Sequence, residues 1–534
     1  MLKNFLRMGI KNFKNKSFLF FFLTIIFFIF FKSKNFSPIY DYQGDTLSYI
    51  SFVTSVLLDF DLDFKNEPIN FDKLRYEFPP HPVGVGIIAS IISFPFSLLD
   101  RIFNSEIIYD RHKFQSSWLV FGMIISSIIM FYYGTIFYFK SIKIMKINID
   151  KYILLSIILG TGILYYVFFT PIFSHIYEYF ILSAIFYLSL KYKKNFRYKY
   201  LFFLVMTLTI SLLIRYNNFN SYLIPYVVIF TEIFRTRKKI SKFKCFFLIS
   251  MCIFTSFIIT NIVMYIFYEA YIYEFSKIYG GMATQKIFHS ANIIEIMKIL
   301  LFSINNFFIL VFTYDAGIIY SNPLCFFVLF FIIFLVNIFY KEYNSKTFII
   351  MFFLLNFSFF GFSYLVALSW KSSAGMYGYR YLLNLTPLII YNTILFFHFI
   401  KNLKIKKLIM MVVVIFSLNS LISQMFVDTT YNLSRKNTQN AFGITRDAVY
   451  KDYNKYFYQE LFKINLYYET AITGVGALII VKLIERSNFF DLINKEKKKK
   501  YEYYFPNLKY QLFLKIFLVY FIWIVTFMKI LKKK

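Results

Sequence analysis

The polar segment from residue 41 to residue 82 holds many of the side chains that could carry out chemistry in this chain. Between residues 40 and 80 there are eight carboxylates and three cations, although the whole chain has a formal net charge of +31. A carboxylate at the edge of a membrane can take a proton from a substrate hydroxyl. Asp45 is the first candidate for such a general base, and Asp41 is the second. The alternatives are a cap for a helix that starts near Thr46 and a solvated loop whose acids only keep it out of the lipid.

Three further acids of this segment, Asp59, Asp61 and Asp63, alternate along the chain. On an extended segment they would all point to one side. A divalent metal is compatible with such a row, but a solvated edge explains it at least as well. The sequence therefore requires no metal and no other cofactor.

Cationic residues that could hold a phosphate group lie far along the chain. Arg380 is a candidate clamp because a guanidinium binds phosphate oxygens in pairs, and Lys371 would add a point charge. Tyr381 follows Arg380 directly, and Arg215 is a second candidate for the phosphate. The alternative for these cations is ordinary anchoring at the membrane interface.

Glu178, His175 and His81 complete the set of candidate site residues. An acid about one turn inside a membrane helix, as expected for Glu178, is costly unless it faces a cavity or a partner. Glu178 is therefore a candidate second catalytic acid, with a structural hydrogen bond to Tyr or His as the alternative. The two histidines are candidates for substrate binding, although histidines in such positions are more often structural.

The composition places these residues in a polytopic α-helical membrane protein. The 534 residues are 58% hydrophobic and only 16% charged, and long apolar runs recur from end to end. The positive charges stand in short clusters between these runs, where they orient helices, so they do not indicate binding of nucleic acid. The three cysteines lie in apolar segments and suggest neither disulfides nor a zinc site.

The apolar runs predict about twelve membrane spans, or thirteen if residues 471–484 cross. The basic residues before the first span place the N-terminus in the cytoplasm. Apart from residues 471–484, the predicted spans are 17–31, 118–139, 152–169, 175–190, 200–214, 221–234, 246–267, 318–340, 348–367, 388–400, 408–426 and 512–528.

Charge clusters also predict which segments stay outside. If residues 83–99 or 299–312 crossed, the following lysine clusters would move to the outer side, so both are expected to form outer interfacial helices. Residues 83–99 are expected to form a broken helix because of their glycines and Pro95. Residues 46–58 are expected to form a helix on the membrane surface. This topology places Asp41, Asp45, Glu178, Lys371 and Arg380 on the outer side.

The order of these motifs resembles that of the GT-C superfamily of integral-membrane glycosyltransferases, which includes the protein O-mannosyltransferases and the bacterial aminoarabinose transferases. The resemblance covers roughly residues 15–400, and it departs from the family pattern at Thr46, where a second acid is usual. The similar elements are Gly44-Asp45-Thr46-Leu47-Ser48-Tyr49-Ile50, Asp61-Leu62-Asp63, Pro80-His81-Pro82-Val83-Gly84, Ile176-Tyr177-Glu178 and Gly378-Tyr379-Arg380-Tyr381-Leu382-Leu383 with Pro387.

The resemblance implies a catalytic domain over residues 1–426, with an outer loop at 32–115, and a separate C-terminal region at 427–534 with one or two membrane helices. It implies a protein of the bacterial inner membrane whose site faces the periplasm or the outside. The expected partners are a polyprenyl-phosphate-sugar donor, a lipid, glycan or protein acceptor, and the membrane itself. Two other functions remain open from the residues alone: a transporter or flippase of a lipid-linked saccharide, and a membrane scaffold without catalysis.

Overall fold

The computed structural model describes the N-terminal half of the chain most fully. The described residues are 45–61, 81–103, 109–110, 113–114, 118–145, 149, 151–168, 171–226, 228, 242–268, 271, and single positions or short runs between 294 and 417, of which 406–415 is the longest. This part is built of helices, apart from two short antiparallel strands, β1 (Tyr109–Asp110) and β2 (Lys113–Phe114). The described fold is therefore helical, as the apolar runs predict.

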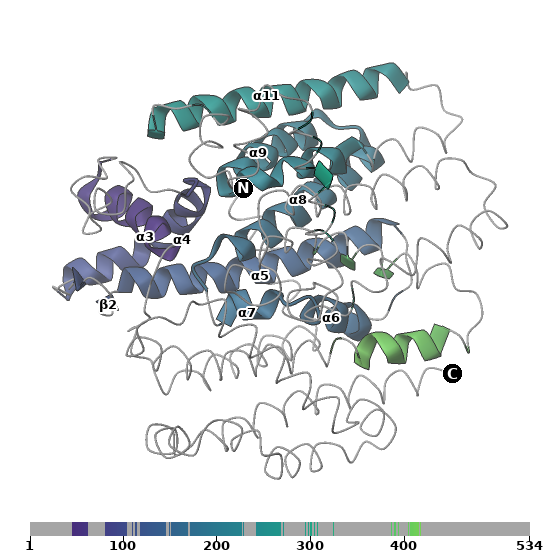
Figure 1. The fold of residues 1–534 in the computed structure, drawn as a ribbon, viewed down its shortest axis with the longest axis horizontal. Helices are drawn as coiled ribbons and strands as arrows, with labels where there is room; N and C mark the ends of the chain where they lie inside the picture. Colours follow the sequence, from purple (N-terminus) through teal and green to yellow (C-terminus); the bar gives the residue numbers. More distant parts are fainter. Residues whose placement is uncertain are drawn as a thin grey trace, which may run out of the picture. The chain divides into compact units, whose positions relative to one another are not determined.

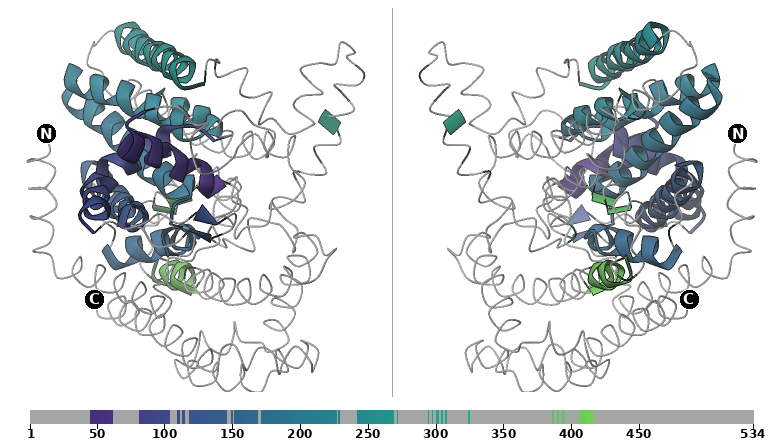
Figure 2. Two further views of the ribbon diagram at one scale, coloured as in Figure 1. Left: turned by 90° about the vertical axis from the view of Figure 1, so that its left-hand side faces the viewer. Right: turned by 90° about the vertical axis from the view of Figure 1, so that its right-hand side faces the viewer.

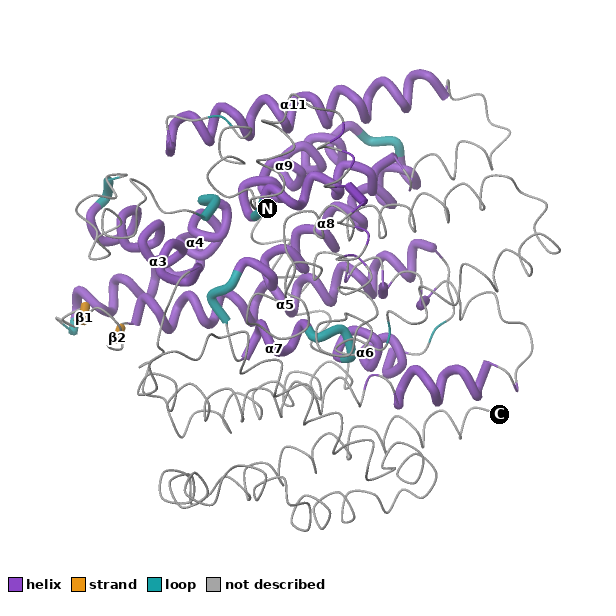
Figure 3. The backbone as a smooth tube through the Cα atoms, viewed as in Figure 1, coloured by secondary structure: helices purple, strands orange, loops and turns teal. Residues whose placement is uncertain are grey.

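The chain divides into two compact units, and the candidate residues fall in the larger one, which comprises residues 38–148 and 161–399. Its helices are coloured from purple to teal in Figure 1 and drawn as purple tubes in Figure 3. They are α3 (Asp45–Thr54), the π-helix η2 (Ser55–Asp59), α4 (Gly84–Ile102), α5 (Trp118–Met145), α7 (Ile163–Phe168), α8 (Ser174–Asn195), α9 (Tyr198–Ile214), the 3-10 helix η4 (Tyr216–Tyr222) and α11 (Lys242–Tyr268). The smaller unit contains α6 (Lys151–Leu159) and the helical residues 406–415.

Three helices of the described part are long and apolar enough to span a membrane. They are α4 with 19 residues, α5 with 28 residues, and residues 244–268 of α11. The predicted spans 118–139, 175–190, 200–214 and 246–267 all fall within helices, namely α5, α8, α9 and α11. The predicted spans 17–31, 318–340, 348–367, 471–484 and 512–528 lie outside the described residues, and 221–234, 388–400 and 408–426 are described only in part.

Contacts between α5 and α8 show that these two helices run in the same direction. The hydroxyl of Tyr177, in the first turn of α8, donates to Ser126 Oγ in the third turn of α5 at 3.1 Å. Farther along, the Phe137 ring stacks on Tyr187 with centroids 5.2 Å apart. Residue numbers therefore rise together along both helices.

The helices α9 and α11 run opposite to α8. Arg215, directly after α9, contacts Glu178 near the start of α8. Thr209 Oγ1 of α9 donates to the carbonyl oxygen of Ser256 in α11 at 3.3 Å, and Leu213 packs with Tyr268 at the end of α11. The starts of α5 and α8 and the ends of α9 and α11 thus lie at one end of the bundle, which we call the site end. Figure 2 shows these helices more nearly end-on.

The helix α4 is continuous, so the expectation of a broken helix over residues 83–99 is wrong. Pro95 lies inside it without ending it. At its C-terminal end, the Asp100 carboxylate accepts the backbone N–H groups of Trp118 at 2.8 Å and Leu119 at 2.7 Å, which satisfies the first turn of α5. At its N-terminal end, Gly84 lies against the end of α9. Both ends of α4 therefore contact helix ends that belong to the site end. Its length of about 28 Å is enough to cross a membrane. That residues 83–99 stay outside the membrane remains a prediction.

The predicted span 152–169 is wrong as a single helix. The structure has α6 and α7 instead, separated by Gly160, Thr161 and Gly162. Gly162 has a φ of 78°, a backbone conformation that glycine adopts at no steric cost and that interrupts a helix. Helices of nine and six residues are each too short to cross a bilayer alone.

The segment 46–58 is helical, as expected, and its place on the membrane surface stays a prediction. Seven consecutive residues of α3, from position 48 to position 54, are buried, so this helix packs against other parts of the protein. The extended conformation expected around Asp59 and Asp61 is wrong, because Asp59 ends a π-helix and Phe60 turns the chain with a φ of 59°. Asp63 lies outside the described residues. Ser55 Oγ then donates to the carbonyl oxygen of Asp61 at 2.8 Å.

Candidate functional site

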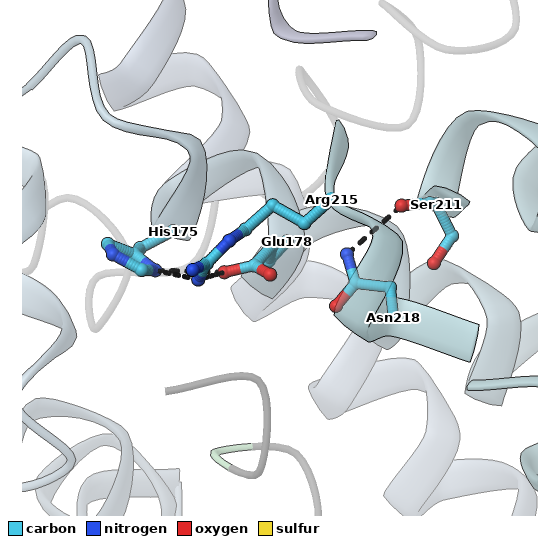
Figure 4. A network of polar contacts seen from close by, with 5 residues as sticks. All are labelled: His175, Glu178, Ser211, Arg215 and Asn218. Atoms are coloured by element: carbon cyan, nitrogen blue, oxygen red, sulfur yellow. Dashed lines mark hydrogen bonds and ion pairs between the residues drawn. The ribbon is translucent and has the colours of Figure 1, made fainter. Parts of the chain in front are cut away.

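Three candidate residues form one buried polar cluster at the site end. Glu178 Oε2 accepts a hydrogen bond from His175 Nδ1 at 2.9 Å and another from Arg215 Nη1 at 3.3 Å. The Glu178 side chain is 1% exposed and that of Arg215 is 14% exposed. Figure 4 shows the guanidinium and the imidazole both directed toward the carboxylate. Pairing with a guanidinium is what allows a carboxylate to be buried in an apolar bundle.

One ring nitrogen of His175 lies within hydrogen-bond distance of two neighbouring side chains. Its Nδ1 lies 2.9 Å from Glu178 Oε2 and 3.1 Å from Arg215 Nη1. A protonated Nδ1 donates to the carboxylate, whereas an unprotonated one accepts from the guanidinium, so the two bonds exclude each other. The rings of Tyr166 at 4.5 Å and Phe173 at 6.3 Å flank the imidazole and hold it in place.

The chain leaves helical geometry at Arg215, and this directs the residue toward α8. Arg215 has φ −158° and ψ 137°, and α9 ends at the residue before it. The break is held by Asn218, whose Nδ2 donates to the carbonyl oxygen of Ser211 at 3.0 Å. The backbone N–H of Asn218 also donates to the carbonyl oxygen of Arg215 at 3.0 Å. The start of η4 therefore fixes the direction in which the arginine leaves α9.

His81 connects the helix that begins at Asp45 to the rest of the site end. Its Nδ1 lies 3.1 Å from Ser48 Oγ, and the Tyr49 ring meets the imidazole edge-on at 5.3 Å. The hydroxyl of Tyr268, at the end of α11, donates to the carbonyl oxygen of His81 at 2.7 Å. These contacts give the buried His81 a structural role that places α3 beside α11.

Gly84 brings the turn at His81 against the end of α9. A Cβ atom on Gly84 would lie 2.5 Å from the Leu213 carbonyl carbon and 2.6 Å from the Ile214 nitrogen. Only glycine permits this approach of two backbones. A buried cluster of Phe52, Val83, Leu213, Met264 and Tyr268 surrounds the contact. The beginning of α4 is thus held against Leu213 and Ile214, the two residues that precede Arg215.

We expect Gly84→Ala to destabilise the protein by about 1–3 kcal/mol, the usual cost of forcing extra volume into a packed interface. The added methyl group would meet backbone atoms of Leu213 and Ile214, which cannot move aside as a side chain can. Denaturation of the purified protein in mixed micelles by increasing SDS measures the change. Ile91→Ala, at a side chain that is 72% exposed on the same helix, is the control. Equal stability of the two variants would contradict the predicted backbone clash.

Five of the candidate residues lie in the described part of the chain, four with their side chains and one with its backbone alone. His81, His175, Glu178 and Arg215 lie at the site end, and Asp45 is the first residue of α3. Asp41, Lys371, Arg380 and Tyr381 lie outside the described residues, so their roles stay predictions.

Sequence reasoning missed three residues that hold this site together: Ser48, Asn218 and Tyr268. Ser48 belongs to the segment with the Asp45 motif, but a serine there has no distinctive spacing. Tyr268 is one of 46 tyrosines, and its partner His81 is 187 residues away in sequence. The two adjacent asparagines after Arg215 are the one local signal, because asparagines near a helix end suggest a turn.

No group of three or more His, Cys, Asp or Glu side chains within the described residues is arranged to hold a metal ion. The cluster of Glu178, His175 and Arg215 instead combines one acid with a guanidinium and an imidazole. Such a set can bind and orient polar groups.

Comparison with known proteins gives no match: no family model, no curated protein and no solved structure resembles the chain.

Proposed function

We propose that this protein is an integral-membrane glycosyltransferase that moves a sugar from a polyprenyl-phosphate donor to an acceptor at one face of the membrane. One observation carries the proposal. Residues from segments far apart in the sequence, at Asp45, His81, Glu178 and Arg215, converge at one end of the same set of helices. A lipid-linked substrate needs its polar head bound at a helix end and its chain in the lipid.

Asp45 is the proposed general base. It takes the proton of the acceptor hydroxyl while the acceptor oxygen bonds to the anomeric carbon of the sugar. The bond from that carbon to the phosphate oxygen breaks, its electron pair goes to the phosphate, and the configuration at the carbon inverts. Glu178 is less suited to this role because one of its oxygens already accepts bonds from His175 and Arg215.

Cations hold the departing phosphate in this proposal. Arg380 and Lys371 are assigned to the phosphate, with Tyr381 beside them, and no metal is assigned. The lysine clusters predict that the site faces the outer side of the membrane, and the family resemblance implies a bacterial inner membrane.

A transporter or flippase of a lipid-linked saccharide is the second candidate function. It is favoured by the buried Glu178 and Arg215 pair and by the interruption of the helix at Gly160–Gly162. Buried charge and discontinuous helices are both common where transporters bind their substrates.

Mass spectrometry of envelope glycans and lipids from cells with and without an active copy tests the proposal. A transferase adds a sugar to an acceptor, so one glycan or lipid loses a defined sugar mass when the copy is inactive. A flippase instead leaves its lipid-linked saccharide intact and accumulated on the cytoplasmic side. Transfer by the purified protein from a radiolabelled polyprenyl-phosphate sugar separates the two, because a flippase forms no new glycosidic bond.

A further inference from the structure

Two buried oxygen atoms at the site end accept no hydrogen bond from any of the residues that the structure describes. They are Glu178 Oε1 and Asn218 Oδ1. Glu178 is 1% exposed and Asn218 is 0% exposed. Buried polar atoms are normally paired, so each unpaired one calls for an explanation. Both atoms are acceptors, and what would satisfy them is a hydrogen-bond donor.

Both residues are fixed around Arg215, so the two oxygens belong to one part of the molecule. Arg215 Nη1 donates to the other carboxylate oxygen of Glu178, and the Arg215 carbonyl oxygen accepts the backbone N–H of Asn218. Asn218 Nδ2 donates to the Ser211 carbonyl oxygen at 3.0 Å, which sets the orientation of the amide and leaves Oδ1 as its remaining acceptor. Figure 4 shows Glu178 at the guanidinium of Arg215, and Asn218 beside Ser211.

The charge of this cluster selects a neutral donor. The single negative charge of Glu178 is already compensated by the guanidinium of Arg215 at 3.3 Å. A metal ion or an ammonium group bound at Oε1 would be repelled by that guanidinium. The single carboxylate of Glu178 would then have to compensate two positive groups. Hydroxyl groups donate hydrogen bonds without adding charge. A sugar ring carries several of them.

We propose that Glu178 Oε1 and Asn218 Oδ1 bind hydroxyl groups of the sugar on a lipid-linked donor. This inference rests on the proposed function, and it names the part of the substrate that the cluster recognises. It also gives Glu178 a role in binding in place of proton transfer.

Thermal unfolding of the full-length protein in detergent, with defined lipids added, tests this site. The probes are undecaprenyl phosphate without a sugar, undecaprenyl phosphates carrying a hexose, an N-acetylhexosamine or an aminopentose, and methyl glucoside as a free sugar. We expect at least one sugar-bearing lipid to raise the unfolding midpoint more than the bare lipid phosphate does. Asn218→Leu should weaken binding of that lipid about three- to tenfold relative to binding of the bare lipid phosphate, as expected for one lost hydrogen bond to the sugar.

Ser221→Ala is the matched control. Ser221 lies on the same 3-10 helix, is 1% exposed, and shares a hydrogen bond of 3.1 Å with Ser211, but it supplies neither proposed acceptor. It should cost stability without changing the preference for the sugar-bearing lipid. Asn218→Ala replaces Asn218→Leu if the larger side chain prevents folding.

Two results would overturn the inference. One is an equal shift with every lipid in the wild-type protein, which would assign the two oxygens to structural water. The other is an unchanged sugar preference in the Asn218 variants. Sugar transfer by the wild-type protein in either case would leave the proposed function standing, whereas absence of transfer with any donor and acceptor would remove the function itself. Stabilisation by methyl glucoside alone, lost in the Asn218 variants, would assign the site to the sugar of an acceptor.

Discussion

Asp45→Asn is expected to reduce sugar transfer about 10²–10⁴-fold, the usual contribution of a general base, and to leave the protein folded in the membrane. Asparagine keeps the shape of the side chain, and at a helix start it is about as favourable as aspartate. This matters because α3 begins at Asp45. Asparagine cannot accept the proton of the acceptor hydroxyl, so the proposed step fails. Transfer from a radiolabelled polyprenyl-phosphate sugar by the purified variant measures the loss.

Asp59→Asn is the matched control for this experiment. It makes the same chemical change at an exposed acid, at the end of the π-helix that follows α3, and it should leave transfer unchanged. Arg380→Lys should give an intermediate loss, because the charge survives but the paired phosphate contacts do not. Full transfer by the Asp45→Asn variant would move the base to Asp41 or Glu178, and an acceptor that is already ionised would make the variant nearly silent.

Arg215→Ala is expected to destabilise the protein by about 3–5 kcal/mol, because it leaves a buried carboxylate without its compensating charge. Glu178 is 1% exposed and loses its guanidinium partner at 3.3 Å. Increasing SDS in mixed micelles, with tryptophan fluorescence as the signal, measures the change in unfolding free energy.

Two further variants show whether the loss comes from the ion pair. Arg197→Ala removes an exposed arginine at the opposite end of α9 and should change stability by no more than about 0.5 kcal/mol. Adding Glu178→Gln to Arg215→Ala should recover part of the lost stability, because the amide carries no charge to be compensated. A stability loss in Arg215→Ala no larger than that in Arg197→Ala would mean that the pair contributes nothing.

The amino-acid sequence by itself determined the helical class of the protein and most of the helices that are described. Long apolar runs predicted α5, α8, α9 and α11 because a helix in lipid must satisfy its own backbone and cover it with apolar side chains. The same rule failed at α6 and α7. Hydropathy carries no information about backbone conformation, so the positive φ of Gly162 could not be predicted from the apolar run that contains it.

The sequence also indicated the types of residue at the site, and five of them lie in the described part. It did not determine their partners. Glu178 and Arg215 are 37 residues apart, and only the opposite directions of α8 and α9 bring them together. His81 and Tyr268 meet for the same kind of reason, because α11 ends where the turn before α4 begins.

Only the tertiary structure decided which helix ends meet, and thereby which polar atoms are satisfied. Helical period and hydropathy are local properties, whereas a hydrogen bond between Asn218 and Ser211 depends on how the chain leaves α9. Gly84 is a second example, because its lack of a side chain lets the backbone of α4 touch the backbone of α9. The residue types that suggest chemistry were thus readable from the chain, but their pairing, and the two oxygens left over by it, followed from packing.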